Sequence, residues 1–308
     1  MNIAKNTDTN EFSLNEFFKA KEIDKDGKKE YVFEYENEVQ KWLTFIKGQY
    51  TKGGFRPDLK KDIPTPFGNA NLENYLAHTF WMLPRVNSCY AMEDLLKKNS
   101  FFDEYKIITA AGNRVGSGNK AVIPVIDAIG KDRSSKTITL SCGKLREGVT
   151  VEQWNAVFML SDIKSPESYF QTAFRAQSPD VIKYLDDNGS EIYDIQKEKC
   201  YVFEFSPNRT LQLITEYAVS LNTQSEYSHE QKIQQFLNFL PVLAYEGDSM
   251  YLVDAKQALE FSYSGIGMSM LAERWKSRLL VNVNNDALER LMEHPDIIEA
   301  LENMDDFV

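Results

Sequence analysis

Apolar residues near the start of the chain recur with a helical period. Residues 35–50 predict an amphipathic helix, because their apolar positions fall on one face. That face consists of Val39, Leu43 and Ile46. Ser13 and Glu16 form a capping box, which predicts the start of a shorter helix. Residues 51–70 combine glycines and prolines without periodicity, so we expect residues 1–70 to be a peripheral segment and linker.

From about residue 71, strand-like runs alternate with helical ones. These runs are residues 78–84, 88–99, 105–112, 121–130, 137–142, 155–161, 200–206 and 209–221. Several strand-like runs are almost continuously apolar, which is typical of strands whose two faces are covered by helices. The alternation predicts a mostly parallel sheet with right-handed crossovers. We therefore expect an α/β domain over residues 71–225 and a mainly helical subdomain over residues 226–308.

Composition narrows the class of protein. The chain has 308 residues, of which 43% are hydrophobic and 26% are charged, as in ordinary globular proteins. No apolar run approaches the roughly 20 residues that span a bilayer, so we expect no membrane contact. The cysteines are far apart and the histidines are isolated. This spacing argues against disulfides and metal sites and favours a cytoplasmic location.

The distribution of charge bears on possible nucleic-acid partners. The formal net charge of −11 argues against a protein coated with basic surface. The net negative charge is concentrated in residues 240–308, whereas residues 71–180 are close to neutral. A local cationic groove in the α/β domain is therefore compatible with the sequence.

Two loops that follow predicted strands carry candidate binding residues, because ligands collect beyond the carboxyl ends of parallel strands. Residues 84–88 open a helix, so their backbone amides are placed to hold a phosphate. Residues 143–150 combine positive charge with a glycine and a hydroxyl. The candidates are Arg85, Asn87 and Ser88 in the first loop, and Lys144, Arg146, Gly148 and Thr150 in the second. For each loop the alternative is an ordinary solvated loop.

A third candidate lies on a predicted helix. Ser165 is a suitable N-cap and Pro166 suits the first helical position. Gln171, Arg175 and Ser178 follow at helical spacing and would share one face. An arginine on that face could bind a phosphate through its forked guanidinium. The alternative is a surface arginine that pairs with a neighbouring acid.

These segments together resemble part of a known motor family. TLSCGKLREGVTV (139–151) resembles motif V, and QTAFRAQS (171–178) resembles motif VI, which is written Q-x-x-G-R-x-x-R. Over roughly residues 71–225 the chain resembles the second RecA-like domain of a superfamily-two helicase or translocase. The segment SYFQTAFRAQSP (168–179) most resembles DEAD-like helicases of bacterial restriction and phage-defence systems. The resemblance implies a RecA-like sheet flanked by helices.

The resemblance also implies roles for single residues. Gln171 and Arg175 match motif VI and would be catalytic, with Arg175 as an arginine finger. Phe174 replaces the motif glycine and Ser178 the second arginine, so Arg175 would act alone or in a domain of weakened chemistry. The implied nucleotide-binding residues are Gly148, Thr150 and Arg175. The implied nucleic-acid-binding residues are Arg85, Asn87, Ser88, Lys144, Arg146 and Thr150.

Half of a helicase ATP site is missing from this sequence. It contains no G-x-x-x-x-G-K-[ST] loop, and Asp103-Glu104 precedes a predicted strand instead of ending one. We therefore expect ATP and Mg²⁺ to be held mainly by a partner, an N-terminal RecA-like domain or subunit, and DNA to be a second partner. The chain would be the carboxyl-side portion of a larger motor, or would work beside one, and would have no ATPase activity alone. One alternative is a non-catalytic RecA-like protein-interaction module. A small-molecule α/β enzyme is another, which no nucleophile–base pair supports.

Overall fold

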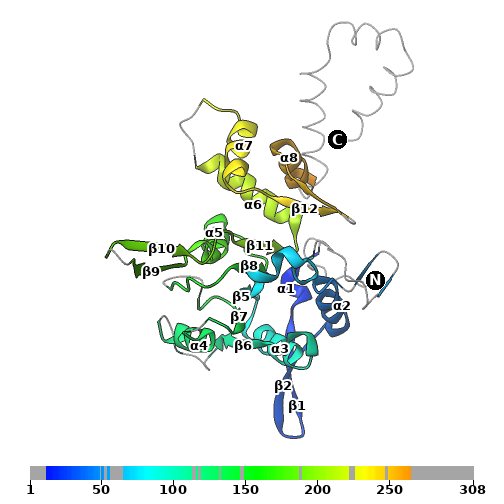
Figure 1. The fold of residues 1–308 in the computed structure, drawn as a ribbon. Coiled ribbons are helices and arrows are strands. Elements are labelled where there is room, and N and C mark those ends of the chain that lie inside the picture. Colours follow the sequence, from blue (N-terminus) through cyan, green and yellow to red (C-terminus); the bar gives the residue numbers. More distant parts are fainter. Residues whose placement is uncertain are drawn as a thin grey trace, which may run out of the picture.

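A five-stranded parallel sheet forms the centre of the molecule (Figure 1). The computed structural model describes residues 12–48, 50–51, 54–55, 65–112, 116, 119–131, 133–145, 149–186, 189–221, 226–246 and 249–264. The strands of the central sheet are β5 (His78–Met82), β6 (Tyr105–Ala110), β7 (Lys136–Ser141), β8 (Ala156–Met159) and β11 (Tyr201–Glu204). Their order is β11-β8-β5-β7-β6, and all neighbouring pairs are parallel. The predicted α/β class is therefore confirmed, and the arrangement is consistent with a RecA-like fold.

Helices cover both faces of this sheet. One face is covered by α1 (Leu14–Phe17), α2 (Glu36–Ile46) and α3 (Val86–Lys97), and the other by α4 (Asn119–Ile129), α5 (Pro166–Ala173) and α6 (Pro207–Ser220). Side chains alternate along a strand, so Trp81 of β5 packs into the first layer while Phe80 and Met82 pack into the second. This burial on both sides explains the almost continuous apolar runs of the sequence.

The N-terminal segment is an integral layer of this domain, not the peripheral segment that the sequence predicts. Ser13 caps α1 by accepting a hydrogen bond from the Glu16 amide. The apolar face predicted for α2 is fully buried. Trp42 of α2 packs edge-on against Trp81, with 6.0 Å between the ring centroids. Residues 12–46 therefore shield apolar strand surface from water, which is the main source of stabilisation in such layers.

The connection from β7 to β8 spans residues 142–155 and passes over the face of β5, and its described residues, 142–145 and 149–155, form no helix. Leu145, Val149, Val151 and Trp154 are buried in the core of the α4–α6 layer. Trp154 lies against Phe80, with 4.7 Å between the ring centroids. The apolar residues of the loop thus take the place of a crossover helix.

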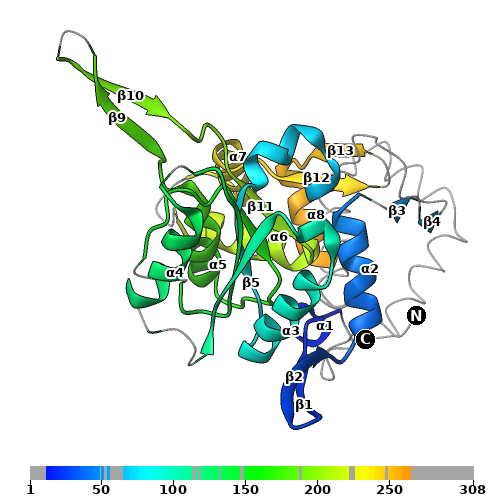
Figure 2. The same cartoon turned by 60° about the horizontal axis from the view of Figure 1, so that its bottom comes forward.

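Two β-hairpins extend from the body of the molecule, as Figure 2 shows. The first consists of β1 (Ala20–Lys25) and β2 (Lys28–Phe33), and the second of β9 (Val181–Leu185) and β10 (Glu191–Ile195). Asp26 and Gly27 join β1 to β2 with φ values of 54° and 77°, as a two-residue hairpin turn requires. Each hairpin is a separate two-stranded sheet among the described strands.

Short elements fill the remaining connections. They are β3 (Tyr50–Thr51), β4 (Gly54–Phe55) and the 3₁₀ turns η1 (Pro66–Gly68), η2 (Ala70–Leu76), η3 (Ser100–Phe102) and η5 (Phe174–Gln177). Gly48 follows α2 with a φ of 73°. A Cβ placed on Gly48 would come within 2.7 Å of the Gly68 Cα, so the close approach of these two segments needs glycine.

The described part of the predicted C-terminal subdomain, residues 226–264, is only partly helical. Helices α7 (His229–Phe239) and α8 (Ala255–Ser264) flank a hairpin of β12 (Leu243–Glu246) and β13 (Ser249–Leu252). Ile233 and Ala258 belong to the same core cluster as the α4–α6 layer, so this part shares the core of the sheet domain. Within the described ranges, no helix is both long enough and apolar enough to cross a membrane.

Candidate functional site

Helix α5 forms as the sequence predicts. The Ser165 hydroxyl caps it, accepting a hydrogen bond from a backbone amide of the first turn at 3.1 Å, and Pro166 occupies the first position. Phe170 is buried against Tyr217 of α6, with 4.5 Å between the ring centroids. Gln171 is the next residue and its side chain is exposed. The helix is thus anchored on its apolar side and presents Gln171 to solvent.

Arg175 connects α5 to the loop that follows β7. It lies on η5 and is half-buried. Its Nε donates a hydrogen bond to the Gln171 carbonyl at 3.3 Å, and a terminal guanidinium nitrogen donates to the Val149 carbonyl. Thr150, next to Val149, is exposed. Arg175 therefore joins the two segments whose sequences resemble motif V and motif VI.

Lys144 lies in the same loop, closer to β7. Its Nζ donates a hydrogen bond to the Gly116 carbonyl at 3.2 Å, which connects this loop to the one after β6. The predicted residues Arg146 and Gly148 lie outside the described residues. The remaining predicted residues on this side of the sheet are Lys144, Thr150, Gln171 and Arg175, which we call the α5-side group.

The loop after β5 carries the other predicted residues. Arg85 immediately precedes α3 and forms an ion pair with Glu16 of α1, with 3.8 Å between nitrogen and oxygen. Asn87 is half-buried in the first turn of α3. Ser88 is fully buried, and its hydroxyl donates a hydrogen bond to the Phe18 carbonyl at 2.5 Å. The nucleic-acid role predicted for Ser88 is therefore wrong, because its hydroxyl is used inside the protein.

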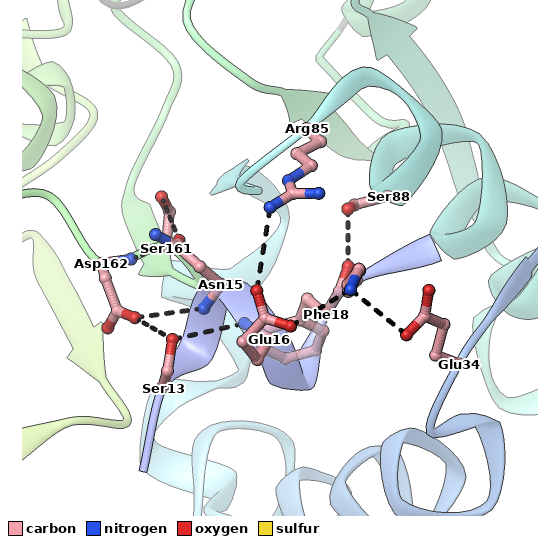
Figure 3. Close-up of polar contacts among 10 residues, drawn as sticks. Ser13, Asn15, Glu16, Phe18, Glu34, Arg85, Ser88, Ser161 and Asp162 are labelled. Carbon is pink, nitrogen blue, oxygen red and sulfur yellow. Dashed lines mark hydrogen bonds and ion pairs between the residues drawn. The ribbon is translucent and has the colours of Figure 1, made fainter. Parts of the chain in front are cut away.

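Helix α1 is fastened to the carboxyl end of β8, as Figure 3 shows. The Ser13 hydroxyl donates a hydrogen bond to the Asp162 carboxylate at 2.7 Å, and the backbone amide of Asn15 donates to the same oxygen at 3.2 Å. In return, the Asp162 amide donates to the Asn15 side-chain oxygen at 2.9 Å, and the Ser161 hydroxyl donates to that oxygen at 3.2 Å. These reciprocal bonds close one part of the strand-end region with a segment from the start of the chain.

Arg209 of α6 completes the network around Asp162. A terminal guanidinium nitrogen lies 2.9 Å from the second carboxylate oxygen of Asp162, and another donates to the Ile163 carbonyl. The Asp162 side chain is only 11% exposed and that of Arg209 is 27% exposed. Asp162 thus links α1, the end of β8 and α6, and its charge is matched by that of Arg209.

A half-buried acid, Glu204, lies at the carboxyl end of β11. Glu204 accepts hydrogen bonds from the amides of Phe205 and Ser206 at 2.8 and 2.9 Å. Burial raises the pKa of Glu204 to about 7, although these hydrogen bonds and nearby Arg209 favour the charged form. Burial also raises the pKa of Tyr169 in α5, whose hydroxyl group adjoins Glu204. Glu204 therefore gains its proton under nearly neutral conditions, beneath the start of α6.

The predicted residues belong to loops that pack on opposite faces of the sheet. Val86, between Arg85 and Asn87, packs in the α1–α3 layer, whereas Val149 is buried in the α4–α6 layer. The α5-side group combines two cations with two neutral polar side chains, a set suited to a phosphate. Across the described residues, no cluster of three or more His, Cys, Asp or Glu side chains is arranged to hold a metal ion.

The docking of α1 and the role of Asp162 are not predicted from the sequence. The capping box indicates that a helix begins after Ser13, but a cap carries no information about what the helix packs against. The signal available for Asp162 was its position, because Ser161 and Asp162 are the first polar residues after a fully apolar strand. In a parallel sheet such residues lie at the edge where ligands and other segments collect.

Comparison with known proteins places this chain near one restriction protein. No protein-family model matches it. It is 29% identical over 288 residues to a Mycoplasma pneumoniae protein described as "Putative type II restriction enzyme and methyltransferase RM.MpnORF110P C-terminus". The match covers 90% of this chain and 37% of the relative, so the chain spans little more than a third of that protein. A solved structure, the C-terminal part of the Fun30 ATPase domain, is 14% identical with a TM-score of 0.30, covering 75% of this chain and 52% of that one.

Proposed function

We propose that this chain is the C-terminal motor-domain portion of an ATP-dependent DNA helicase or translocase of a restriction or phage-defence system. The observation that carries the proposal is the contact of Arg175 with Val149. This contact joins the loop after one parallel strand to the helix after the next strand along the chain. In the motor family that the sequence resembles, the corresponding segments are motif V and motif VI.

The restriction context is supported by the similarity to the Mycoplasma pneumoniae protein. That similarity covers nearly the whole chain, including the central sheet, the loop and α5. Because this chain spans little more than a third of that relative, an activity of the complete protein is a proposal here.

In this proposal two members of the α5-side group, Lys144 and Thr150, contact the phosphates of DNA. Lys144 supplies a cation and Thr150 a hydroxyl, which bind the backbone without reading the sequence of bases. Arg85 and Asn87 would provide a second contact beyond β5. Arg175 acts first as a positioning residue, because its guanidinium holds the loop that carries Thr150. To reach a nucleotide, Arg175 would have to exchange the Val149 carbonyl for a phosphate when a partner domain closes.

We expect this chain not to form an ATP or magnesium site by itself. The described residues include no cluster of carboxylates for magnesium, and the sequence has no phosphate-binding loop. ATP and Mg²⁺ would therefore be held mainly by a partner RecA-like domain, toward which Gln171 and Arg175 would face. It follows that the purified chain hydrolyses no ATP, with or without DNA.

Binding to DNA across a salt series tests the proposal. We expect fluorescence anisotropy to show weak binding whose affinity falls steeply with salt, because bound cations displace counterions from DNA. Lys144→Ala should reduce the slope of log affinity against log salt by about 1. Lys41→Ala, a change to an exposed lysine of α2, is the matched control and should leave the slope unchanged.

Two outcomes would contradict the proposal. An absence of DNA binding at low salt would favour the non-catalytic interaction module. Phe174 and Ser178, which replace the glycine and the second arginine of motif VI, also favour that alternative. ATP turnover by the purified chain that Arg175→Ala abolishes would show that the chain contains a complete nucleotide site.

A further inference from the structure

The hairpin of β9 and β10 presents an unusual amount of apolar surface. Six of its ten strand residues are large apolar side chains with exposures between 36% and 67%. They are Ile182, Tyr184, Leu185, Ile192, Tyr193 and Ile195. They lie on both faces of the hairpin, since consecutive strand residues point to opposite sides. An isolated two-stranded hairpin is only marginally stable in water, and an exposed apolar patch of this kind marks an interaction site. We therefore expect a further strand to pair with this hairpin.

The base of this hairpin is fixed to the body of the protein. Asp180, only 5% exposed, forms an ion pair with Arg133 at 2.7 Å, and its carbonyl accepts a hydrogen bond from the Gln196 amide at 2.9 Å. Lys197 donates to the carbonyls of Glu152 and Trp154 at 2.8 and 3.0 Å. The hairpin is therefore held in a set direction, pointing away from the body as in Figure 2.

The hydrogen-bond pattern shows which backbone groups face outward. The Asp186 amide donates to the Ser190 carbonyl, and the Gln196 amide donates to the Asp180 carbonyl. In an antiparallel hairpin, pairs whose backbone groups bond to each other alternate with pairs whose backbone groups point outward. The two bonds show that the pairs of Asp186 with Ser190 and of Asp180 with Gln196 are of the first kind, as is every second pair between them. The N–H and C=O groups of Glu191, Tyr193 and Ile195 consequently point to the outer edge of β10. Among the described strands, β10 has β9 as its single partner.

We propose that this edge binds a second copy of the chain, with β10 pairing antiparallel to its counterpart about a two-fold axis at Tyr193. In that register Tyr193 lies opposite Tyr193 of the second copy, and Glu191 lies opposite Ile195. Ile192 lies opposite Asp194, so no like charges face each other. The result is one four-stranded sheet that covers part of the exposed apolar surface.

The alternative edge is less suited to self-pairing. The equivalent two-fold on β9 would pass through Lys183 and place two lysines directly opposite each other. In the β10 register, Lys183 instead stays over the Tyr193 ring of its own copy, 5.1 Å from the centroid. Because two strands bury less surface than a standard protein interface, we expect weak association that depends on concentration.

Sedimentation velocity of the full chain tests this proposal with charge pairs. The wild type should pass from monomer to dimer with increasing concentration. Tyr193→Lys and Tyr193→Glu should each be monomeric, because each places two like charges at the two-fold axis. An equimolar mixture of these two variants should form a dimer again. Tyr184→Lys is the matched control on β9, with 51% exposure against 52% for Tyr193, and should dimerise like the wild type.

A second variant tests the edge without adding charge. Tyr193→Pro removes one outward N–H group and leaves the inward pairs of the hairpin intact, so it should abolish the dimer and keep the thermal unfolding of the monomer close to wild type. A wild-type chain that stays monomeric would overturn the proposal and leave the edge to a strand of a different polypeptide. A dimer that survives Tyr193→Lys, or a mixture that fails to associate, would overturn the proposed register.

Discussion

The strand-end loops on the two sides of the central sheet differ in how far other segments of the chain cover them. On the α3 side, α1 covers the loop after β5, so that Arg85 pairs with Glu16 and Ser88 is sealed beneath Phe18. On the α5 side, Thr150 and Gln171 are exposed, and the loop is held to η5 by the bond that the Arg175 guanidinium donates to the Val149 carbonyl. A loop after a parallel strand is therefore accessible only where no distant segment docks on it.

This difference also changes the weight of the candidate residues. Both loops follow parallel strands and both contain basic residues, so the sequence alone ranks them alike. In the structure, Ser88 on the α3 side is buried and Arg85, although exposed, is paired with Glu16 of the α1 segment that docks through Asp162, whereas Thr150 and Gln171 on the α5 side are exposed. We therefore place the main phosphate contacts of the proposed motor on the α5 side.

The largest expected effect on the free energy of unfolding comes from removing the Asp162 carboxylate, which fastens α1 to the α3 side. Asp162→Ala leaves Arg209 without its carboxylate and removes the acceptor for Ser13 and the Asn15 amide. We expect the free energy of unfolding to fall by about 3–4 kcal/mol in urea titrations, because a partly buried charge loses its partner. Asp103→Ala, at an exposed position, should change it by no more than about 0.5 kcal/mol. Equal effects of the two changes would show that α1 is not fastened through Asp162.

A somewhat smaller effect on the free energy of unfolding is expected from Glu204, the half-buried acid at the end of β11. Because the pKa of Glu204 is raised from 4.5 to about 7, the folded state binds its proton more tightly than the unfolded state. The resulting stabilisation is complete below about pH 4.5 and is lost as the pH rises through about 7. Glu204→Gln removes this loss, so it should be more stable than wild type by about 2–3 kcal/mol at pH 8. The gain should disappear near pH 4.5.

Urea titrations at several pH values measure this effect, and the difference between variant and wild type separates Glu204 from other titrating groups. Glu198→Gln, at an exposed position, should show no such pH dependence. A Glu204→Gln variant whose relative stability is the same at every pH would contradict the assignment.

The smallest expected effect concerns the ion pair between Arg85 and Glu16. Its side chains are 54% and 30% exposed and their charged atoms are 3.8 Å apart. Arg85→Ala should therefore lower the free energy of unfolding by less than about 1 kcal/mol. It should also weaken DNA binding less than Lys144→Ala, if the α5 side makes the main contacts. A larger loss of DNA affinity from Arg85→Ala would reverse the ranking of the two sides.

Much of the local structure could be predicted from periodicity and caps. The face of α2, the capped start of α5 and the apolar strands of the central sheet all follow from spacing within a few residues. The site was harder to predict. Gln171 is exposed as expected, but Ser88 is buried by Phe18, which is 70 residues away in the sequence. No local pattern around Ser88 contains that contact.

The hairpin of β9 and β10 illustrates the same limit. Its apolar residues resemble those of an ordinary sheet strand. Only the structure shows that they lie outside the central sheet. The direction in which the hairpin points depends on the ion pair of Asp180 with Arg133, which are 47 residues apart.

The sequence by itself determined the α/β class, most of the central elements and the identity of the basic and polar side chains near the strand ends. These depend on hydrogen bonds and hydrophobic periods that extend over a few residues. The tertiary structure alone decided which of those side chains are exposed, which segment closes the α3 side and which loop Arg175 holds. Such outcomes depend on contacts between segments far apart in the chain, and these contacts exist only after the layers have packed.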